Sequence, residues 1–301
     1  MSFSSDVKEE ICRQKTDRLC CALAESYGIL LFCHSFSPDG IRITTVHPAF
    51  AGRLPKLFKK AFGISFDVLP SGTEIGKRSF IISDREKIAR IYAAVGDSAE
   101  RAIVHHVNYA MLEEDCCRIS FLRGAFLAGG SVTDPEKRYH LELATTHRQV
   151  ERETFTLMQE LGFSPKESFR KGNVLLYFKQ CDAISDFLTA IGAPVTAMTV
   201  ITARVEKEMR NTVTRQINCD SANADKTVIA AQEQLSAIRR YASLYGLDSL
   251  PDPLKDAALL RIANPAASLA DLARLSYPAV TKSCLSHRLK KIAALVREDE
   301  K

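Results

Sequence analysis

The stretch CCRISFLRGAFLAGGS, residues 116–131, decides the fold because a related stretch occurs earlier in the chain. The earlier stretch is CCALAESYGILLFCHS, residues 20–35, which aligns with it without a gap at an offset of 96 residues. The same offset aligns Gly96 with Gly192, about 60 residues further on, and a match that returns at one offset indicates an internal duplication. We therefore predict that the chain contains two copies of one unit.

The two copies, at about residues 18–97 and 114–193, show the same order of patterns. An apolar helix rich in small residues opens each copy. Alternating stretches then predict strands, and amphipathic stretches that end at a glycine predict helices. Two such halves are expected to form one α+β domain with pseudo-twofold symmetry and helices on one face of antiparallel sheets. The predicted strands include residues 41–46, 78–83, 139–144 and 174–179, and the later helices are residues 51–63, 84–96, 150–162 and 181–192.

Small residues crowd the opening helix of the second copy and its end. A glycine inside a helix costs about 1 kcal/mol relative to alanine. This cost suggests that the two opening helices pack together at the pseudo-twofold axis, where glycine lets two backbones approach closely. A phosphate-binding loop is the alternative, but no Gly-x-x-x-x-Gly-Lys motif is present and no Gly-x-Gly-x-x-Gly follows a strand. The small residues are Gly124, Ala125, Ala128, Gly129 and Gly130.

The composition is that of an ordinary globular protein, with 46% hydrophobic and 26% charged residues. A chain of 301 residues favours two domains. No apolar run is long enough to span a membrane, and the N-terminal stretch lacks the apolar core of a signal peptide. We therefore expect a cytoplasmic protein without a membrane partner. The net charge of +5 is compatible with a nucleic-acid partner but does not prove one.

The nine cysteines predict neither a metal site nor a cofactor. Their number is odd, and no Cys-x-x-Cys occurs, which argues against a zinc knuckle or ribbon. Cys33 stands beside His34, but two further ligands at a recognisable spacing are missing. We expect reduced thiols packed as small apolar groups. The cysteines are Cys12, Cys20, Cys21, Cys33, Cys116, Cys117, Cys181, Cys219 and Cys284.

The residues from about 223 onward predict an all-α domain of four helices. The first is expected from Asp225 to near Tyr245, and the second follows two prolines that suit a helix start. The third begins at Ser268, which with Asp271 forms a capping box that has Asp in place of Glu or Gln. A tight break at residues 276–278 precedes the fourth helix, which runs from about 281 to 297.

The last predicted helix has one apolar face and one basic face. Its apolar side chains recur at spacings of four, three and four residues, from Leu285 to Val296. From Tyr277 through Arg297 there are five Lys or Arg residues and no acidic residue. A short helix, a tight turn and such a second helix form a helix-turn-helix, at about residues 268–301. A solvated basic face on an ordinary helical bundle is the alternative. The predicted DNA-binding residues are Lys282, Ser283, Ser286 and His287, placed to meet base edges or nearby phosphates, and Arg288, Lys290, Lys291 and Arg297, placed to meet phosphates.

The segment between the two domains, residues 204–226, mixes basic and acidic side chains with recurring asparagines. Because Asn and Asp favour caps and turns, we predict a strand or short helix and then a turn near Asp220 that caps the next helix. The segment is either a buried polar hinge or a hinge that also contacts DNA phosphates through Arg210 and Arg215.

Two stretches show a resemblance to a known family. FLRGAFLAGGSV resembles a degenerate LAGLIDADG helix of the homing endonucleases, and CCRISFLRGAFLAGGSVTDPEKRYHLEL resembles the bacterial WhiA family. The stretches EKEMRNTVTRQINCDSANADKT and LSHRLKKIAALV strengthen the match. The resemblance covers essentially the whole chain. It implies a duplicated LAGLIDADG-like domain at 1–200, a linker at 201–222 and an all-α helix-turn-helix DNA-binding domain at 223–301.

The resemblance also predicts the loss of nuclease chemistry. Active LAGLIDADG enzymes hold divalent metal ions with an acidic residue at the end of each signature helix. These positions correspond to Gly129 in the second copy and Cys33 in the first, and neither carries a carboxylate. By the same resemblance the strands could contact DNA, although an ordinary solvated sheet face is at least as good an interpretation. The outward candidates are Arg42, Thr44, Arg78, His140 and Lys179.

Double-stranded DNA is the partner that these features imply. We expect a nucleoid-associated, sequence-specific transcription regulator, and the WhiA resemblance implies a role in cell division and chromosome segregation, or in sporulation in some relatives. The alternative is an interaction scaffold that docks on RNA polymerase or another transcription regulator. A LAGLIDADG nuclease is disfavoured. Steep salt dependence of DNA affinity separates the regulator from the scaffold.

Overall fold

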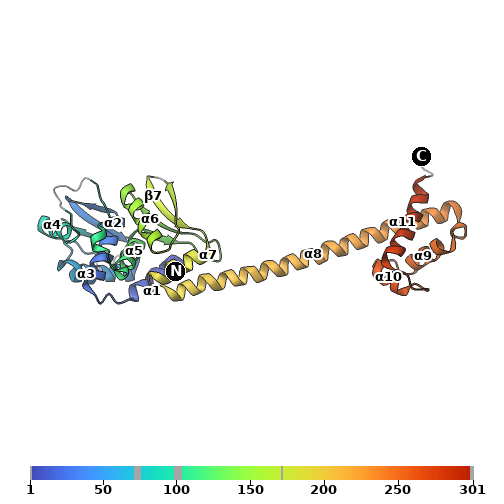
Figure 1. Ribbon diagram of the computed structural model, residues 1–301, viewed down its shortest axis with the longest axis horizontal. Coiled ribbons are helices and arrows are strands. Elements are labelled where there is room, and N and C mark those ends of the chain that lie inside the picture. Colours follow the sequence, from blue (N-terminus) through green and yellow to red (C-terminus); the bar gives the residue numbers. More distant parts are fainter. Residues whose placement is uncertain (1, 71–75, 98–103, 171, 299–301) are drawn as a thin grey trace. The chain divides into compact units, whose positions relative to one another are not determined.

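The computed structural model describes residues 2–70, 76–97, 104–170 and 172–298 (Figure 1). The chain divides into two compact units, Met1–Lys207 and Glu208–Lys301. Each unit has its own cluster of buried apolar side chains, so each has its own core. The first unit is α+β and the second is all-α, as predicted.

The first unit contains the two predicted copies, preceded by the helix α1 (Phe3–Arg13), which the sequence analysis did not single out. Both copies have the expected order of elements, and the predicted helix stops Gly63 and Gly162 have positive φ angles of 69° and 85°. The first copy consists of α2 (Leu19–Phe32), β1 (Ser35–Ser37), β2 (Gly40–Thr45), α3 (Pro48–Phe62), β3 (Arg78–Ile82) and α4 (Arg85–Ala94). After the short 3-10 helix η1 (Tyr109–Met111), the second copy consists of α5 (Asp115–Gly129), β4 (Gly130–Val132), β5 (Leu141–Thr145), α6 (Arg148–Glu160), β6 (Lys166–Arg170), β7 (Asn173–Phe178) and α7 (Cys181–Ala190).

Each copy forms one antiparallel sheet. The strand order is β1-β2-β3 in the first copy and β4-β5-β7-β6 in the second. Ile43 pairs with Phe80 in the first sheet and Leu143 with Leu176 in the second, and all four side chains are buried. The equivalent pairings confirm the duplication. The strand β6 was not predicted, because its five residues are all exposed and show no alternation of apolar and polar side chains.

The opening helices α2 and α5 pack against each other at the centre of the first unit, as predicted (Figure 1). A Cβ atom added to Gly124 would lie 2.0 Å from the carbonyl oxygen of Glu25, and one added to Gly28 would lie 2.1 Å from that of Phe121. Only glycine allows this approach of two backbones. The first turns of the two helices lie side by side, because the sulfur atoms of Cys20 and Cys21 lie within 4.8 Å of those of Cys116 and Cys117, so the helices run parallel with their N-termini at one end of the pair.

The segment between the predicted domains corrects an expectation. Residues 204–226 form no strand and no turn at Asp220, but lie within one helix, α8 (Pro194–Tyr245). No glycine or proline occurs between positions 195 and 245. An Asn or Asp in a helix costs at most about 0.7 kcal/mol relative to alanine, so scattered Asn and Asp residues do not break it. Residues 208–226 are all exposed, which also excludes a hinge buried within the second unit.

The second unit packs the C-terminal part of α8 with three further helices. A single-turn 3-10 helix, η2 (Leu247–Ser249), follows Gly246, and then come α9 (Asp252–Ala263), α10 (Leu269–Leu275) and α11 (Lys282–Glu298). The later three helices begin and end close to the predicted positions. Their shared core contains Ile238, Tyr241, Leu250, Leu254, Ala257, Ala258, Leu272, Ala273, Leu285, Leu289, Ile292 and Val296.

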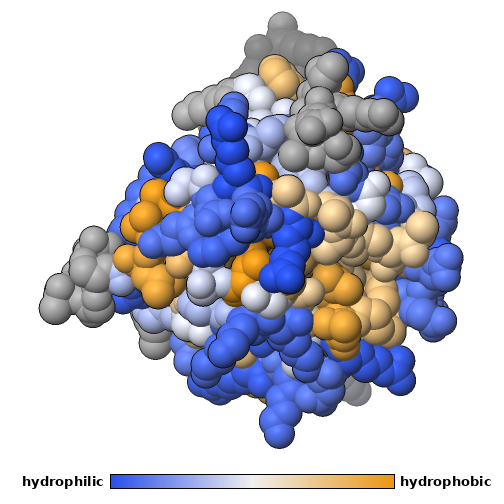
Figure 2. Space-filling view, turned by 90° about the vertical axis from the view of Figure 1, so that its left-hand side faces the viewer, coloured by the Kyte–Doolittle hydropathy of each residue, from blue (hydrophilic) through white to orange (hydrophobic). Residues whose placement is uncertain are grey.

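The surface of the first unit is mixed in character. On the side shown in Figure 2, patches of apolar residues lie among polar ones. Among the described residues, no helix combines the length and the apolar character needed to cross a membrane.

Candidate nucleic-acid interface

The helices α10 and α11 are joined by a turn at the predicted place. Ser268 caps α10: its Oγ accepts a hydrogen bond from the backbone N–H of Asp271 at 3.2 Å. The Ser268 hydroxyl donates in turn to the Asp271 carboxylate at 2.6 Å, so the predicted pair forms, although the carboxylate binds the hydroxyl and not the backbone N–H of Ser268. Thr281 holds the first turn of α11, since its Oγ1 accepts from the N–H of Cys284 at 3.2 Å. Side-chain caps therefore fix the start of both helices.

The helix α11 has the two predicted faces. Leu285 and Leu289 are each 1% exposed, and the later members of the apolar stripe, Ile292 and Val296, are also buried. This stripe packs α11 against α9 and α10. Burying four aliphatic side chains, at roughly 1.5–3 kcal/mol each, orients the helix about its axis and so sets which side chains face outward.

The outward face of α11 brings most of the predicted DNA-binding residues together. Lys282, Ser286 and Lys290 follow one another at intervals of four residues and so share one side of the helix. These three, with Ser283, His287 and Leu269 of α10, line a shallow groove. Lys291 is exposed and Arg288 is half-buried. Arg297 lies in the last turn of α11, but its side chain lies outside the described part of the structure.

One basic residue near this groove was missed by the sequence analysis. Lys226 of α8 lines a depression that it shares with Lys282 and Ser268. It lies within the second unit and in the first helix predicted for that domain, but the sequence analysis gave it no role in DNA binding. Its spacing of four residues from Ala230 and eight from Gln234, which line the same depression, is the helical signal that could have placed it beside Lys282.

The first sheet places two of its three outward candidates as predicted. Arg42 is exposed and Thr44 half-buried, and both alternate with buried isoleucines along β2. The Thr44 hydroxyl lies 3.5 Å from that of Ser79 on the neighbouring strand. Arg78 corrects the prediction, because it has the parity of the buried Phe80 and not that of Ser79. Arg78 is half-buried at the start of β3 and does not share a face with Arg42.

The outer face of the second sheet carries charges of both signs. His140 Nε2 lies 3.0 Å from the carboxylate of Glu142, which also accepts a hydrogen bond from the Ser131 hydroxyl at 3.2 Å. Lys179 is exposed and its ammonium lies 5.1 Å from the centre of the Tyr177 ring. An acidic group at the centre of this face opposes binding of a phosphate backbone, so this sheet is a weaker candidate than α11.

The two positions equivalent to the metal-binding acids lie at the C-terminal ends of the paired helices. Gly129 is the last residue of α5, and an added Cβ would lie 2.4 Å from the carbonyl oxygen of Ala144. Cys33 follows α2, and its thiol donates toward the carbonyl oxygens of Leu30 and Ser35 at 3.2 and 3.3 Å. Burial raises the pKa of Cys33 to about 12. A thiol is thus kept protonated at one position, and no side chain fits at the other.

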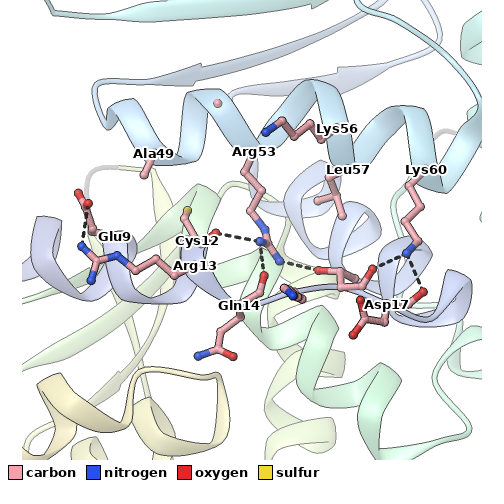
Figure 3. Close-up of a pocket in the computed structure, with 13 residues that line it drawn as sticks. Glu9, Cys12, Arg13, Gln14, Asp17, Ala49, Arg53, Lys56, Leu57 and Lys60 are labelled. Carbon is pink, nitrogen blue, oxygen red and sulfur yellow. Dashed lines mark hydrogen bonds and ion pairs between the residues drawn. The ribbon is translucent and has the colours of Figure 1, made fainter.

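A buried ion-pair network supports the helix pair from the side. Glu25 of α2 is fully buried and accepts from the Arg53 guanidinium at 2.6 and 2.9 Å, while Arg123 lies 3.7 Å away. Figure 3 shows the groove beside this network, where Arg53 also donates to backbone carbonyls and Lys60 donates to the carbonyl oxygens of Thr16 and Asp17. Because both cations already bind groups within the protein, we interpret the groove as a feature that stabilises the fold.

The remaining candidates, Arg210 and Arg215, are exposed on α8 within the second unit. They lie five residues apart in a helix, so their side chains point in directions that differ by about 140°. One flat surface therefore does not contact both.

Comparisons with known proteins agree with this architecture. The family description "WhiA LAGLIDADG-like domain" matches residues 118–210, and "WhiA C-terminal HTH domain" matches residues 213–296. The crystal structure of full-length WhiA from Thermatoga maritima superimposes with a TM-score of 0.60 at 23% identity and covers 99% of both chains. A crystal structure of the N-terminal LAGLIDADG domain of WhiA gives a TM-score of 0.50 at 20% identity, over 64% of this chain and 92% of that one.

Full-length relatives are more similar in sequence. A probable cell division protein WhiA from Ruminiclostridium cellulolyticum is 36% identical over 300 residues, which cover 97% of this chain and 96% of the relative. Its counterpart from Alkaliphilus metalliredigens is 34% identical over 307 residues, with 97% and 96% coverage. A LAGLIDADG-like domain followed by a C-terminal helix-turn-helix domain is thus the domain order of a known family. The chain belongs to the WhiA family.

Proposed function

We propose that this protein is a sequence-specific regulator that binds double-stranded DNA through α11 and acts in the control of cell division and chromosome segregation, in the cytoplasm and at the nucleoid. The observation that carries the proposal is the outward face of α11, where Lys282, Ser286 and Lys290 lie in line on a helix whose other face is fixed in the core. A helix-turn-helix inserts such a face into the major groove, its N-terminal residues toward the bases. The relatives' name, probable cell division protein, supports the cellular role.

The test selects binding sites for the full-length chain from a pool of random-sequence duplexes. The wild-type chain should enrich a defined motif, and Lys282→Ala/His287→Ala should lose that motif, because both side chains lie near the N-terminus of α11. Arg239→Ala, which removes an exposed cation from α8, is the matched control and should keep the motif. Enrichment of the same motif by Lys282→Ala/His287→Ala would contradict the proposed role of α11. If even the wild-type chain enriches nothing, the scaffold that docks on RNA polymerase or another regulator becomes the better proposal.

We also propose that the first sheet and α8 supply secondary contacts to DNA phosphates. Arg42 and Arg210 are exposed cations on different elements of the two units. Each cation that contacts a phosphate contributes about 1 to the slope of log affinity against log salt concentration. The variants Arg42→Ala, Arg78→Ala, Arg210→Ala and Arg215→Ala should therefore separate true contacts, which lower the slope, from solvated charges, which leave it unchanged.

The proposal includes the absence of DNA cleavage. The side-chain position at Gly129 is closed by backbone, and the Cys33 thiol is protonated, so neither helix end offers a hard oxygen ligand for Mg²⁺. Supercoiled plasmid incubated with the full-length chain and Mg²⁺ or Mn²⁺ should remain intact at every protein concentration that binds it. Nicked or linear products that disappear with added EDTA would contradict this part of the proposal.

A further inference from the structure

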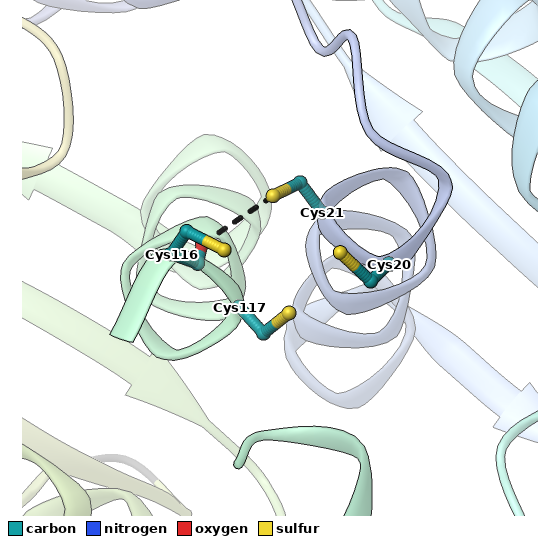
Figure 4. A group of neighbouring side chains, drawn as sticks. All are labelled: Cys20, Cys21, Cys116 and Cys117. Atoms are coloured by element: carbon teal, nitrogen blue, oxygen red, sulfur yellow. Dashed lines mark hydrogen bonds between the residues drawn. The ribbon is translucent and has the colours of Figure 1, made fainter. Parts of the chain in front are cut away.

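Four cysteine thiols meet where the paired helices begin. Cys20 and Cys21 lie in the first turn of α2, and Cys116 and Cys117 in the first turn of α5. Figure 4 shows the four sulfur atoms turned toward one another across the gap between the two helices. All four sulfur atoms lie within 4.8 Å of one another. The cluster is separated from the degenerate acid positions by nearly the whole length of the helices, since twelve residues of helix span about 18 Å.

The duplication explains why the four sulfurs converge. Cys20 corresponds to Cys116 and Cys21 to Cys117 at the offset of the two copies. Because α2 and α5 run parallel with their first turns side by side, equivalent residues of these turns lie at the same level. One vicinal pair on each helix therefore generates two pairs of ligands around one centre. A search for Cys-x-x-Cys along the chain cannot find this arrangement, because the pairs lie 96 residues apart.

We propose that these four cysteines form a tetrathiolate site for a thiophilic divalent cation, Zn²⁺ above all. Zinc in a structural site binds four thiolates in a tetrahedron at about 2.3 Å, which places the sulfurs about 3.8 Å apart. The separations in the cluster, at most 4.8 Å, exceed that spacing by no more than about 1 Å. The exposure decreases from Cys20, which is exposed, to Cys117, which is buried, so an ion can enter from one side.

The surroundings compensate part of the negative charge of such a site. The Arg18 guanidinium donates toward the Cys116 sulfur at 3.7 Å. Neither helix has a side-chain cap at its N-cap residue, and the positive ends of both helix dipoles lie at the turns that carry the thiols. Hydrogen bonding from Cys21 and Arg18 lowers the pKa of Cys116, whereas burial raises that of Cys117. A bound cation would supply the charge that deprotonates the buried member of the set.

The site is structural in kind, because four protein ligands leave no open position for water or substrate. It would join the first turns of α2 and α5 and so tie the two copies together at the end opposite to Cys33 and Gly129. Binding to the folded state alone raises the stability of that state. The proposal stands on the geometry of the first unit and is independent of the proposed DNA binding.

The test uses the full-length chain, reduced and freed of metal with EDTA, and then titrated with Co²⁺ as a spectroscopic probe and with Zn²⁺. The wild-type chain should bind one equivalent of Co²⁺ with the intense visible absorption and near-ultraviolet charge-transfer bands of a tetrahedral thiolate site. Zn²⁺ should displace the Co²⁺, remain bound through gel filtration in one equivalent, and raise the Tm of the first unit.

Variants make the result specific to the cluster. Cys20→Ser/Cys117→Ser should bind no Co²⁺, while Cys219→Ser/Cys284→Ser, which changes two cysteines of the second unit, should bind it as the wild type does. If the first double variant fails to fold, Cys20→Ser alone serves, because Cys20 is exposed; it should weaken Zn²⁺ retention and alter the Co²⁺ spectrum. Absence of tetrahedral Co²⁺ bands from the wild type, equal binding by both double variants, or disulfides that form within the cluster and leave no Zn²⁺ site would each overturn the proposal.

Discussion

The helices α5 and α11 are similar in length but bury their surfaces in different ways. Eight of the fifteen residues of α5 are buried, and its Gly124 touches the backbone of the partner helix. In α11 one row of aliphatic side chains is buried and the opposite row, which includes Lys282 and Lys290, is exposed. A helix surrounded by protein is constrained by packing at almost every position, whereas a helix with a free face can carry chemistry at little cost in stability. The motif of α5 therefore predicts architecture, and that of α11 predicts function.

The largest expected effect comes from placing a side chain in the close backbone contact between α5 and α2. Gly124→Ala places a Cβ 2.0 Å from the carbonyl oxygen of Glu25, and the two helices must separate to relieve it. We expect the first unit to lose more than about 3 kcal/mol of unfolding free energy, because a backbone atom cannot turn aside as a side chain does. Urea denaturation with a probe of the first unit measures this loss.

Gly52→Ala is the matched control for Gly124→Ala. Gly52 also lies within a helix, α3, but an added Cβ would meet nothing within 4 Å. The same substitution should therefore stabilise the first unit by up to about 1 kcal/mol, through helix propensity alone. Equal effects of the two substitutions would show that propensity and not close approach decides the cost at Gly124.

The next largest effect is expected from the buried ion pair beside the helix pair. Glu25→Gln removes the charge that the Arg53 and Arg123 guanidinium groups face, and Glu25 is fully buried. Removing one partner of a buried pair typically costs about 3–5 kcal/mol; we expect about 3, because the amide oxygen of Gln still accepts a hydrogen bond. The denaturant midpoint of the first unit measures it. Glu9→Gln breaks the exposed pair with Arg13 and should change the midpoint by less than the equivalent of about 1 kcal/mol.

A smaller loss, confined to the second unit, is expected from the inner face of α11. Leu289→Ala should cost about 2–3 kcal/mol, near the lower end of the range for buried leucines, because the core of this unit is small. The two units have separate cores, so the transition of the first unit should keep its midpoint. Leu275→Ala on α10, where the side chain is 57% exposed, should change the stability of the second unit by less than about 1 kcal/mol. A shift of both transitions by Leu289→Ala would mean that the two units unfold together.

The sequence predicts those features that depend on local chemistry or on repetition. The duplication appears as one offset, the helix stops as glycines such as Gly63, and the start of α10 as the pair Ser268 and Asp271. The inner stripe of α11 follows from a spacing that only a helix satisfies. These signals lie within a few residues of one another or recur at a fixed distance, so no knowledge of the fold is needed to interpret them.

Other features depend on which side chains the fold brings together, and the sequence analysis missed them. The four-cysteine cluster arises only when α2 and α5 run parallel at close range. The continuity of α8 was hidden by its asparagines, although the lack of Gly and Pro between Pro194 and Gly246 was visible. Arg78 was assigned to the wrong face because the parity of a strand depends on where its pairing begins, which is a property of the sheet register.

The smallest effect on stability, and the sharpest on function, is expected from the outer face of α11. Lys290→Ala should change the unfolding free energy of the second unit by less than about 0.5 kcal/mol, because the side chain is exposed and alanine is a strong helix former. If Lys290 contacts a phosphate, the slope of log affinity against log salt concentration should fall by about 1. Titrations of a selected duplex at several salt concentrations measure that slope.

Ala294→Ser, one turn further along the exposed side of α11, is the control and should leave both the unfolding free energy and the salt slope nearly unchanged. A Lys290→Ala variant that lost stability but kept its salt slope would reverse the roles assigned to the two faces, because Lys290 would then contribute to folding and not to DNA binding.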